Sequence, residues 1–415
     1  MPDKLQTSPE IGSGRRFTLV DALRGIAAVA VLFHHLLFSS ELQATLWLAL
    51  PGWILAFCQR GAFGVDIFFV LSGFVITHSL RNVQLNWKGV GSFMLRRQLR
   101  LDPPYWAMLA LTLASLYVES HVLWIEKKPL PTWYDIFTNL FYLQNIVASY
   151  PLMSVSWTLC LEVQFYLVFI LLLVAGRSLS RNGASSVTLS AALVTALAIA
   201  SLAVPRHYFD GWFIHWWHTF PAGLSAEQTV PDPCWFFQWW YYFAAGALCY
   251  WAVSVPRLRG VFSGFLGLYL VVAALQNREP TVLSSINAML PMLVGWITAL
   301  LLYVAGRMGK LSTWLDFAPF QYLGRISYSL YLSHLLVAVY VMRLGYRLTN
   351  TSHAGALLWF CLAGAASLVA AHVMYVLIER PSIRFAAQFK PRRVGAAPSP
   401  GSHLPGGVKE QLQNV

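Results

Sequence analysis

Ten stretches of about 20 predominantly apolar residues constrain the fold of this chain more than any other feature of its sequence. They cover residues 17–38, 62–80, 102–119, 157–176, 187–204, 235–253, 260–276, 283–304, 322–342 and 355–378. Each approaches the roughly 20 residues that an α-helix needs to cross about 30 Å of hydrocarbon. Charged residues make up only 11% of the chain, against about 25% in soluble domains. The sequence therefore predicts an all-α fold, a polytopic membrane helix bundle of about ten transmembrane helices.

The distribution of positive charge predicts how this bundle is oriented. Of the 29 lysine and arginine residues, 20 lie in segments on the N-terminal side of the predicted spans, and three, Arg24, Arg325 and Arg343, lie inside or beside spans. The opposite side carries the remaining six, Arg60, Lys127, Lys128, Arg206, Arg278 and Arg347. Because cytoplasmic loops of membrane proteins are enriched in lysine and arginine, both termini are predicted to be cytosolic.

Three regions follow from this pattern. Residues 1–16 are polar and are expected to form a cytosolic N-terminal segment, residues 17–385 form the transmembrane domain, and residues 386–415, rich in proline, glycine and serine, form a disordered cytosolic tail. The first apolar run is followed by no small-residue cleavage site, so we expect it to remain as a membrane helix. The five cysteines show neither a CxxC motif nor metal-ligand spacing, so no disulfide and no metal are expected.

The stretch RGIAAVAVLFHH, residues 24–35, places an arginine and two histidines in the first apolar run. Eleven residues separate Arg24 from His35, which puts both on one helix face, about 16 Å apart along the axis. A buried arginine needs an anion or another polar partner, whereas histidine is the usual proton-transfer group near neutral pH. The pair thus indicates group transfer across the membrane. The alternative is that Arg24 reaches the interface and His35 bonds a neighbouring carbonyl.

Two further spans carry polar groups that are costly in a membrane. GVDIFFVLSGFVI contains Ser72 and also Asp66, for which solvation near the outer end of the span is the alternative to a functional role. SWTLCLEVQFY contains Glu162 about two turns into its span, and an intramembrane carboxylate is a candidate functional group. Glu162 is predicted to orient His35 or to act on a hydroxyl itself, and the alternative is that it pairs with an arginine elsewhere.

A cluster of arginines, in FMLRRQLRLDPPYW, precedes the third span on the cytosolic side. Arg96, Arg97 and Arg100 lie within about one helical turn, an arrangement that suits phosphate groups. Topology control by positive charge is the alternative explanation.

The ninth and tenth spans contribute GRISYSLYLSH and the terminal IERP. In the first, Tyr331 and His334 share a helix face and are either site residues or a helix–helix contact. In the second, Glu379, Arg380 and Pro381 are expected to form an interfacial ion pair and to end the helix. Tryptophans at 212, 216, 217, 235, 239 and 240 surround the external segment 205–234, where they either stack on sugar rings or form an interfacial belt.

Taken in order, these motifs resemble the membrane acyltransferase-3 family, bacterial integral membrane proteins that O-acylate sugars. The resemblance covers about residues 17–385 and rests on LVDALRGIAAVAVLFHH, GVDIFFVLSGFVI, RRQLRLDPPYW, SWTLCLEVQFY, GRISYSLYLSH and IERP. Thr158 stands where serine is commoner, and Asp102 precedes the proline of the arginine motif. Family members differ in whether a soluble esterase-like domain follows the last span, and a single-module enzyme is expected here.

The resemblance implies an O-acetyltransferase of the bacterial inner membrane that moves an acyl group, most often acetyl, from cytosolic acyl-CoA to a carbohydrate hydroxyl, either lipid-linked or polymeric. Catalysis is assigned to His35, as general base or transient acyl carrier, and to Glu162. The predicted substrate-binding residues are Arg24, Arg96, Arg97, Arg100, Ser72, Tyr105, Trp157, Tyr331 and His334. The competing function is a transporter or exporter of a sugar or small molecule, whose helices also carry intramembrane polar groups. Against it, the sequence shows no internal repeat and no paired broken helices.

Overall fold

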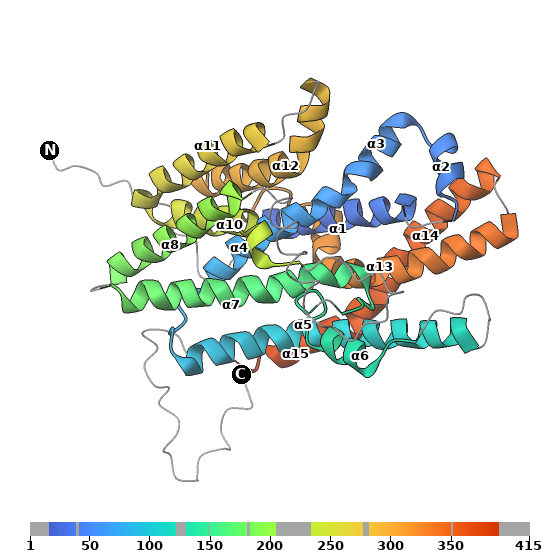
Figure 1. Cartoon of the computed structure of the whole chain (residues 1–415), viewed down its shortest axis with the longest axis horizontal. Coiled ribbons are helices and arrows are strands. Elements are labelled where there is room, and N and C mark those ends of the chain that lie inside the picture. Colours follow the sequence, from blue (N-terminus) through green and yellow to red (C-terminus); the bar gives the residue numbers. More distant parts are fainter. Residues whose placement is uncertain are drawn as a thin grey trace, which may run out of the picture.

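The computed structural model describes residues 16–38, 41–121, 130–147, 149–180, 183–204, 234–276, 282–349 and 352–389. These residues form helices joined by turns, with no β-strand among them, as the sequence predicts. Most long helices run side by side along the long axis of the molecule (Figure 1). The predicted external segment 205–234 and the predicted tail fall almost wholly outside the described residues.

The long helices are the following, in chain order. They are α1 (Thr18–Phe38), α4 (Gly64–Leu80), α5 (Trp87–His121), α7 (Trp157–Ser178), α8 (Gly183–Ala203), α10 (Trp240–Ser254), α11 (Arg259–Gln276), α12 (Val282–Arg307), α13 (Ala318–Thr349) and α14 (His353–Met374). Shorter elements are α2 (Gln43–Ala49), α3 (Gly52–Arg60), η1 (Gly61–Phe63), α6 (Trp133–Leu140), η2 (Ser154–Ser156), η3 (Phe236–Trp239), η4 (Pro256–Leu258), the π-turn η5 (Tyr375–Glu379) and α15 (Arg380–Ala386).

Eight stretches of the described chain are long and apolar enough to cross a membrane, against the ten predicted. The difference lies in the predicted spans 102–119 and 235–253, both of which are helical. The first forms the second half of α5, where Asp102, Glu119 and two prolines lower the mean hydropathy. The second is α10, only 15 residues long. The chain is therefore a multi-pass helical membrane protein, and two of its predicted spans are too short or too polar to be identified as membrane-spanning by length and hydropathy.

Two helix boundaries differ from the sequence prediction. The helix α5 is continuous through Pro103 and Pro104 and begins at Trp87, so the basic cluster and the predicted span 102–119 belong to one helix. The last helix does not end at Pro381, because η5 widens the backbone by one π-turn and Pro381 then occupies the first turn of α15. Proline is compatible with that position, since its missing N–H would have no helical partner there.

Three hydrophobic clusters hold the bundle together. In the first, α10 is surrounded by α4, α8, α11 and α12, and every residue from Trp240 to Val253 is buried. In the second, α1 packs against α13 and α14, with α2 and α3 at one end. The third joins α5, the start of α7 and α13. The helix α4 contacts both α1 and α10, so the polar residues of α1, α4, α5, α7 and α13 meet where the three clusters adjoin.

Candidate active site

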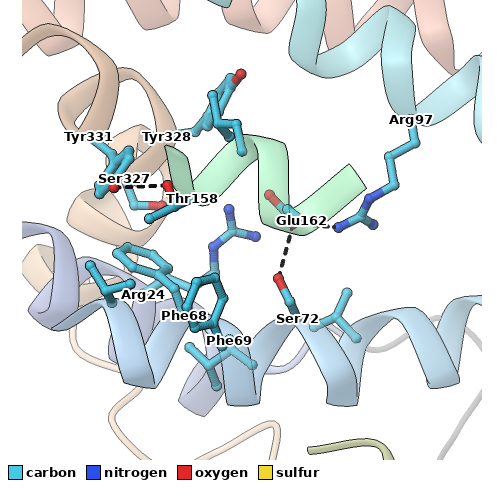
Figure 2. Close-up of a pocket in the computed structure, with 14 residues that line it drawn as sticks. Arg24, Phe68, Phe69, Ser72, Arg97, Thr158, Glu162, Ser327, Tyr328 and Tyr331 are labelled. Carbon is cyan, nitrogen blue, oxygen red and sulfur yellow. Dashed lines mark hydrogen bonds and ion pairs between the residues drawn. The ribbon is translucent and has the colours of Figure 1, made fainter. Parts of the chain in front are cut away.

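A cavity lies between α1, α4, α5, α7 and α13. Its polar lining residues include Arg24 of α1, Ser72 of α4, Arg97 of α5, Glu162 of α7 and Tyr331 of α13, which Figure 2 shows together. The structure thus brings together residues that the sequence places on five different helices, and we call this space the arginine cavity.

Glu162 organises one wall of the arginine cavity. Its Oε1 atom accepts hydrogen bonds from Ser72 Oγ at 3.0 Å and from Arg97 Nη2 at 3.1 Å (Figure 2). Arg97 also donates to the hydroxyl of Tyr166, and its guanidinium carbon lies 4.0 Å from the centre of that ring. The pairing of Glu162 with an arginine, which the sequence left as an alternative, is therefore present, and it fixes the direction of the Arg97 side chain.

Arg24 and Arg100 are two further arginines near this ion pair, and Arg24 lines the cavity whereas Arg100 does not. The Nε atoms of Arg24, Arg97 and Arg100 are all buried without a hydrogen-bond partner. Arg24 and Arg100 both interact electrostatically with Glu379, which is 1% exposed and accepts a 2.6 Å hydrogen bond from Ser329 Oγ. Three guanidinium groups therefore share two carboxylates. A buried charged donor without a partner is costly, so this arrangement favours an anionic ligand.

The interfacial ion pair predicted for Glu379 is wrong. The carboxylate is buried at the end of η5. There it accepts a hydrogen bond from Ser329 of α13 and interacts electrostatically with Arg24 and Arg100. The π-turn carries this carboxylate into the bundle, which a regular helix ending at the interface would not do. Glu379 is thus a neighbour of the arginine cavity that the sequence pattern did not reveal.

His35 lies outside the arginine cavity and lines a second one, which we call the histidine cavity. Its Nδ1 atom is 3.0 Å from the Val31 carbonyl oxygen and 3.3 Å from Nε2 of His334. His334 is fully buried, and its own Nδ1 lies 3.1 Å from the Leu330 carbonyl oxygen. Since carbonyls only accept, both rings carry their proton on Nδ1, and Nε2 of His35 remains as the basic atom.

The expected contact between Glu162 and His35 does not form, because the two residues line different cavities and Glu162 Oε1 is shared by Ser72 and Arg97. The two cavities have two lining residues in common, Val65 and Tyr331. The Tyr331 hydroxyl exchanges a 2.9 Å hydrogen bond with Thr158 Oγ1 and donates to the Val155 carbonyl at 3.2 Å. Tyr331 therefore forms part of the boundary through which a transferred group would pass.

The remaining predicted site residues have distinct positions. Trp157 lines the histidine cavity, whereas Arg96 lines neither cavity. Tyr105 is fully buried, stacks on Tyr142 and donates a 2.7 Å hydrogen bond to the Asn139 carbonyl. This geometry ties the segment after α6 to α5 and does not support substrate contact by Tyr105. His334 contacts His35 without lining either cavity.

The sequence analysis did not identify Tyr166 as a residue of the site. Tyr166 lies one helical turn after Glu162, so helical periodicity could have identified it as a neighbour of the Glu162 partner. Trp240, one of the tryptophans considered for sugar stacking, is fully buried and donates to the Val194 carbonyl at 3.3 Å. Trp239 does line the histidine cavity. Residues 212, 216 and 217 lie outside the described residues. Among those described, no cluster of three or more histidine, cysteine, aspartate or glutamate residues could hold a metal ion.

Comparison with known proteins gives consistent results. The acyltransferase-3 family model, described as an acyltransferase domain, matches residues 18–376. The peptidoglycan O-acetyltransferase OatA of Listeria monocytogenes is 31% identical over 163 residues, which are 36% of this chain and 23% of that protein. The O-acetyltransferase OatA of Staphylococcus aureus is 29% identical over 160 residues, again 36% and 23%. The alignments thus span about a quarter of these relatives' own length. No solved structure gives a significant match.

Proposed function

The chain belongs to the acyltransferase-3 family, and from this membership we propose that it is an O-acetyltransferase of the bacterial inner membrane. It transfers an acetyl group from acetyl-CoA to a hydroxyl of a cell-envelope carbohydrate. The names of its relatives, which are O-acetyltransferases and in one case act on peptidoglycan, support the acetyl group and the carbohydrate acceptor. Membership of an enzyme family also favours this function over the transporter alternative.

The observation that supports the acyl-CoA donor is a set of three guanidinium groups: Arg24 and Arg97 line the arginine cavity, and Arg100 interacts electrostatically with both. Their unpaired Nε–H groups offer donors to an anion, and two carboxylates leave one positive charge uncompensated. Coenzyme A carries a diphosphate and a further phosphate, for which arginine is the usual partner because it presents several donors in a rigid plane. Glu162 and Tyr166 hold Arg97 in one orientation, so the site is formed before the donor arrives.

His35 supplies the base in this proposal. The acceptor hydroxyl gives its proton to Nε2 of His35 while its oxygen bonds to the acyl carbon. The carbon–sulfur bond of the thioester then breaks, and the departing thiolate of CoA receives the proton from the imidazolium. The two cavities meet at Val65 and Tyr331, where the flexible arm of the donor would present the thioester to the acceptor. A transient acyl-imidazole on the same nitrogen is the alternative route.

The test is transfer of radiolabelled acetyl from acetyl-CoA to peptidoglycan fragments by the purified protein in lipid nanodiscs. General-base catalysis contributes about 10²–10⁴-fold, so His35→Ala should lower kcat by that factor. Arg100→Gln should instead raise the KM for acetyl-CoA. His372→Ala is the matched control, because this imidazole bonds Tyr322 and lines neither cavity. Wild-type transfer rates in His35→Ala, or a folded wild-type protein that consumes no acetyl-CoA, would contradict the proposal.

A further inference from the structure

One face of α4 follows the arginine cavity from its charged end to the place where it meets the histidine cavity. The α4 residues on this face are spaced by three or four positions, and they are Val65, Phe68, Ser72 and Val75. Ser72 marks the charged end, since it bonds Glu162, and Val65 marks the other end, since it lines both cavities. Val65 precedes Ser72 by seven positions, which is about 10 Å of helix. The α4 side chains that line the cavity between them are all aromatic or aliphatic, so this part of the wall is apolar.

Phe68 and Tyr331 are in contact where the two cavities meet. Their ring centres are 5.8 Å apart and their planes are inclined by 72°, the edge-to-face arrangement of two rings that touch. Tyr331 lines both cavities, and Val65, which does so too, lies one helical turn before Phe68 on the same face of α4. A group that moves from the arginine cavity to the histidine cavity therefore passes Val65, Phe68 and Tyr331, and we call these three residues the junction.

The side chains of the junction are held in place from several sides. The Tyr331 hydroxyl is bonded to Thr158 Oγ1 at 2.9 Å. Phe68 packs against the second and the third hydrophobic clusters at once. The backbone of α4 is fixed against α1 near the junction, because a Cβ atom at Gly64 would lie 2.5 Å from the Ala27 carbonyl oxygen. Neither ring can therefore move aside without a loss of packing.

The junction lies next to the proposed base. The Tyr331 ring is 5.9 Å from the His334 ring, and His334 in turn contacts His35 at 3.3 Å. A thioester carbon that reacts at His35 therefore has its acyl substituent beside the junction. The lining of the histidine cavity is more polar, since it includes His34 and Asp66, and Asp66 is 4% exposed rather than solvated as its place near the end of the span suggested. Each further methylene of an acyl chain would meet either the packed junction or this polar lining.

We propose that the junction is the acyl pocket of the enzyme, and that Phe68 determines the length of the acyl group that is transferred. Acetyl, which carries a single methyl on its carbonyl carbon, fits beside Phe68 and Tyr331, whereas propionyl and butyryl must displace one of the rings. One methylene too many in an apolar pocket lowers kcat/KM by about 10–200-fold, so the junction gives a preference for acetyl. This inference rests on the proposed acyltransferase function and deepens it.

The experiment measures kcat/KM for the consumption of acetyl-, propionyl- and butyryl-CoA by the full-length protein in nanodiscs, with peptidoglycan fragments present. The wild type should use butyryl-CoA at least about tenfold less well than acetyl-CoA. Phe68→Ala removes the ring, and it should raise the ratio of butyryl-CoA to acetyl-CoA consumption at least about tenfold. Phe68→Leu should shift this ratio in the same direction by a smaller factor. Val65→Ile adds a methylene to the junction, and it should lower the consumption of propionyl-CoA relative to acetyl-CoA.

Phe262→Leu is the matched control, because this phenylalanine is also packed in the core but belongs to α11 and lines neither cavity. Its ratio of butyryl-CoA to acetyl-CoA consumption should equal that of the wild type, even if its Tm falls. If Phe68→Ala does not fold, Phe68→Leu and Val65→Ile carry the test. Equal consumption of acetyl-CoA and butyryl-CoA by the wild type, or an unchanged ratio in the folded Phe68 variants, would overturn the acyl-pocket assignment alone. Absence of any acyl-CoA turnover by the folded wild type would overturn the proposed function and this inference with it.

Discussion

At the scale of single residues, the contact between His334 and His35 determines which nitrogen of His35 can act as a base. Nε2 of His334 and the Val31 carbonyl both accept from Nδ1–H of His35, so the proton is held away from the cavity. The His334 acceptor comes from α13, whereas the Val31 carbonyl belongs to the same helix as His35. His334 is therefore a positioning residue, and it acts through His35 rather than on a substrate.

Replacement of His334 tests this role. In His334→Leu only the Val31 carbonyl remains to fix the tautomer, and loss of one neutral hydrogen bond should lower kcat about 3–10-fold. In His334→Gln the amide oxygen can take the place of Nε2, so most of the rate should return. The pH dependence of kcat should shift in His334→Leu and remain near that of the wild type in His334→Gln. Equal losses in both variants without a shift in the pH profile would indicate packing alone.

At the scale of elements, two glycines set the distance between α4 and α10. A Cβ atom at Gly73 would lie 1.9 Å from the Phe243 carbonyl oxygen, and one at Gly246 would lie 1.9 Å from the Val70 carbonyl oxygen. The two helices therefore touch backbone to backbone, as small residues permit in membrane bundles. Ser72 and Asp66 lie on α4, so this contact also positions the site.

We expect Gly246→Ala to destabilise the protein, because the added methyl must push α4 and α10 apart. Overpacking of this kind costs typically 1–3 kcal/mol, and activity should fall with the displacement of Ser72. Gly264→Ala on α11 is the control, since a Cβ there meets nothing within 4 Å and alanine favours a helix by about 1 kcal/mol. Thermal unfolding of both variants in detergent measures the difference, and equal Tm values would refute the close-contact argument.

The segment around α6 is held by one carboxylate. Asp135 Oδ2 accepts from the Thr132 amide at 2.9 Å, and Oδ1 accepts from Ser149 Oγ at 2.8 Å and from the Tyr150 amide at 3.1 Å. Burial raises the pKa of Asp135, but these hydrogen bonds outweigh it and hold the pKa below its ordinary value. This contribution to stability is present above the unfolded-state pKa of about 3.9 and is lost as the pH falls through the folded-state pKa.

Asp135→Asn should therefore lower the free energy of unfolding by about 1–2 kcal/mol at pH 7, the cost of a lost cap and charged hydrogen bonds. The deficit should shrink as the pH falls below about 4. The wild-type carboxyl is then protonated first in the unfolded state and, at still lower pH, in the folded state as well. Tm values of the two proteins at pH 7 and pH 3 give the comparison. If the stability deficit of Asp135→Asn persists at pH 3, it comes from the changed hydrogen-bond geometry and not from the lost charge.

At the scale of the whole molecule, the arrangement of spans predicts the positions of the termini. Eight crossings, or ten if α5 and α10 also cross, are both even numbers, and the distribution of positive charge predicts that both ends are cytosolic. Alkaline phosphatase fused after residue 415 should therefore be inactive, and a fluorescent protein fused there should fluoresce. Fusion of the phosphatase after Arg60, which belongs to the predicted outer side, should give activity. Phosphatase activity at the C-terminus would contradict an even number of crossings.

The sequence alone determined the fold class, and it singled out several of the residues that line the two cavities. Apolar runs of membrane length leave a helical bundle as the solution, because backbone polar groups in lipid must be satisfied within each span. Intramembrane charge is rare enough that Arg24, Arg97 and Glu162 stood out, and the structure places all three at one cavity. Tyr105 also stood out by its motif, yet its hydroxyl bonds the carbonyl of Asn139 in α6, which no motif reveals.

Only the tertiary structure decided which of these groups meet. Glu162 bonds Arg97 rather than His35, because helix rotation and depth, which hydropathy does not encode, bring α5 to that face of α7. The buried position of Glu379 depends on a single π-turn, and the partner of His35 comes from a helix that starts 283 residues after it. The separation of the arginine cavity from the histidine cavity is likewise a result of helix packing. Sequence periodicity fixes the face of each helix, whereas the contact between faces is set by side-chain interlocking over the whole bundle.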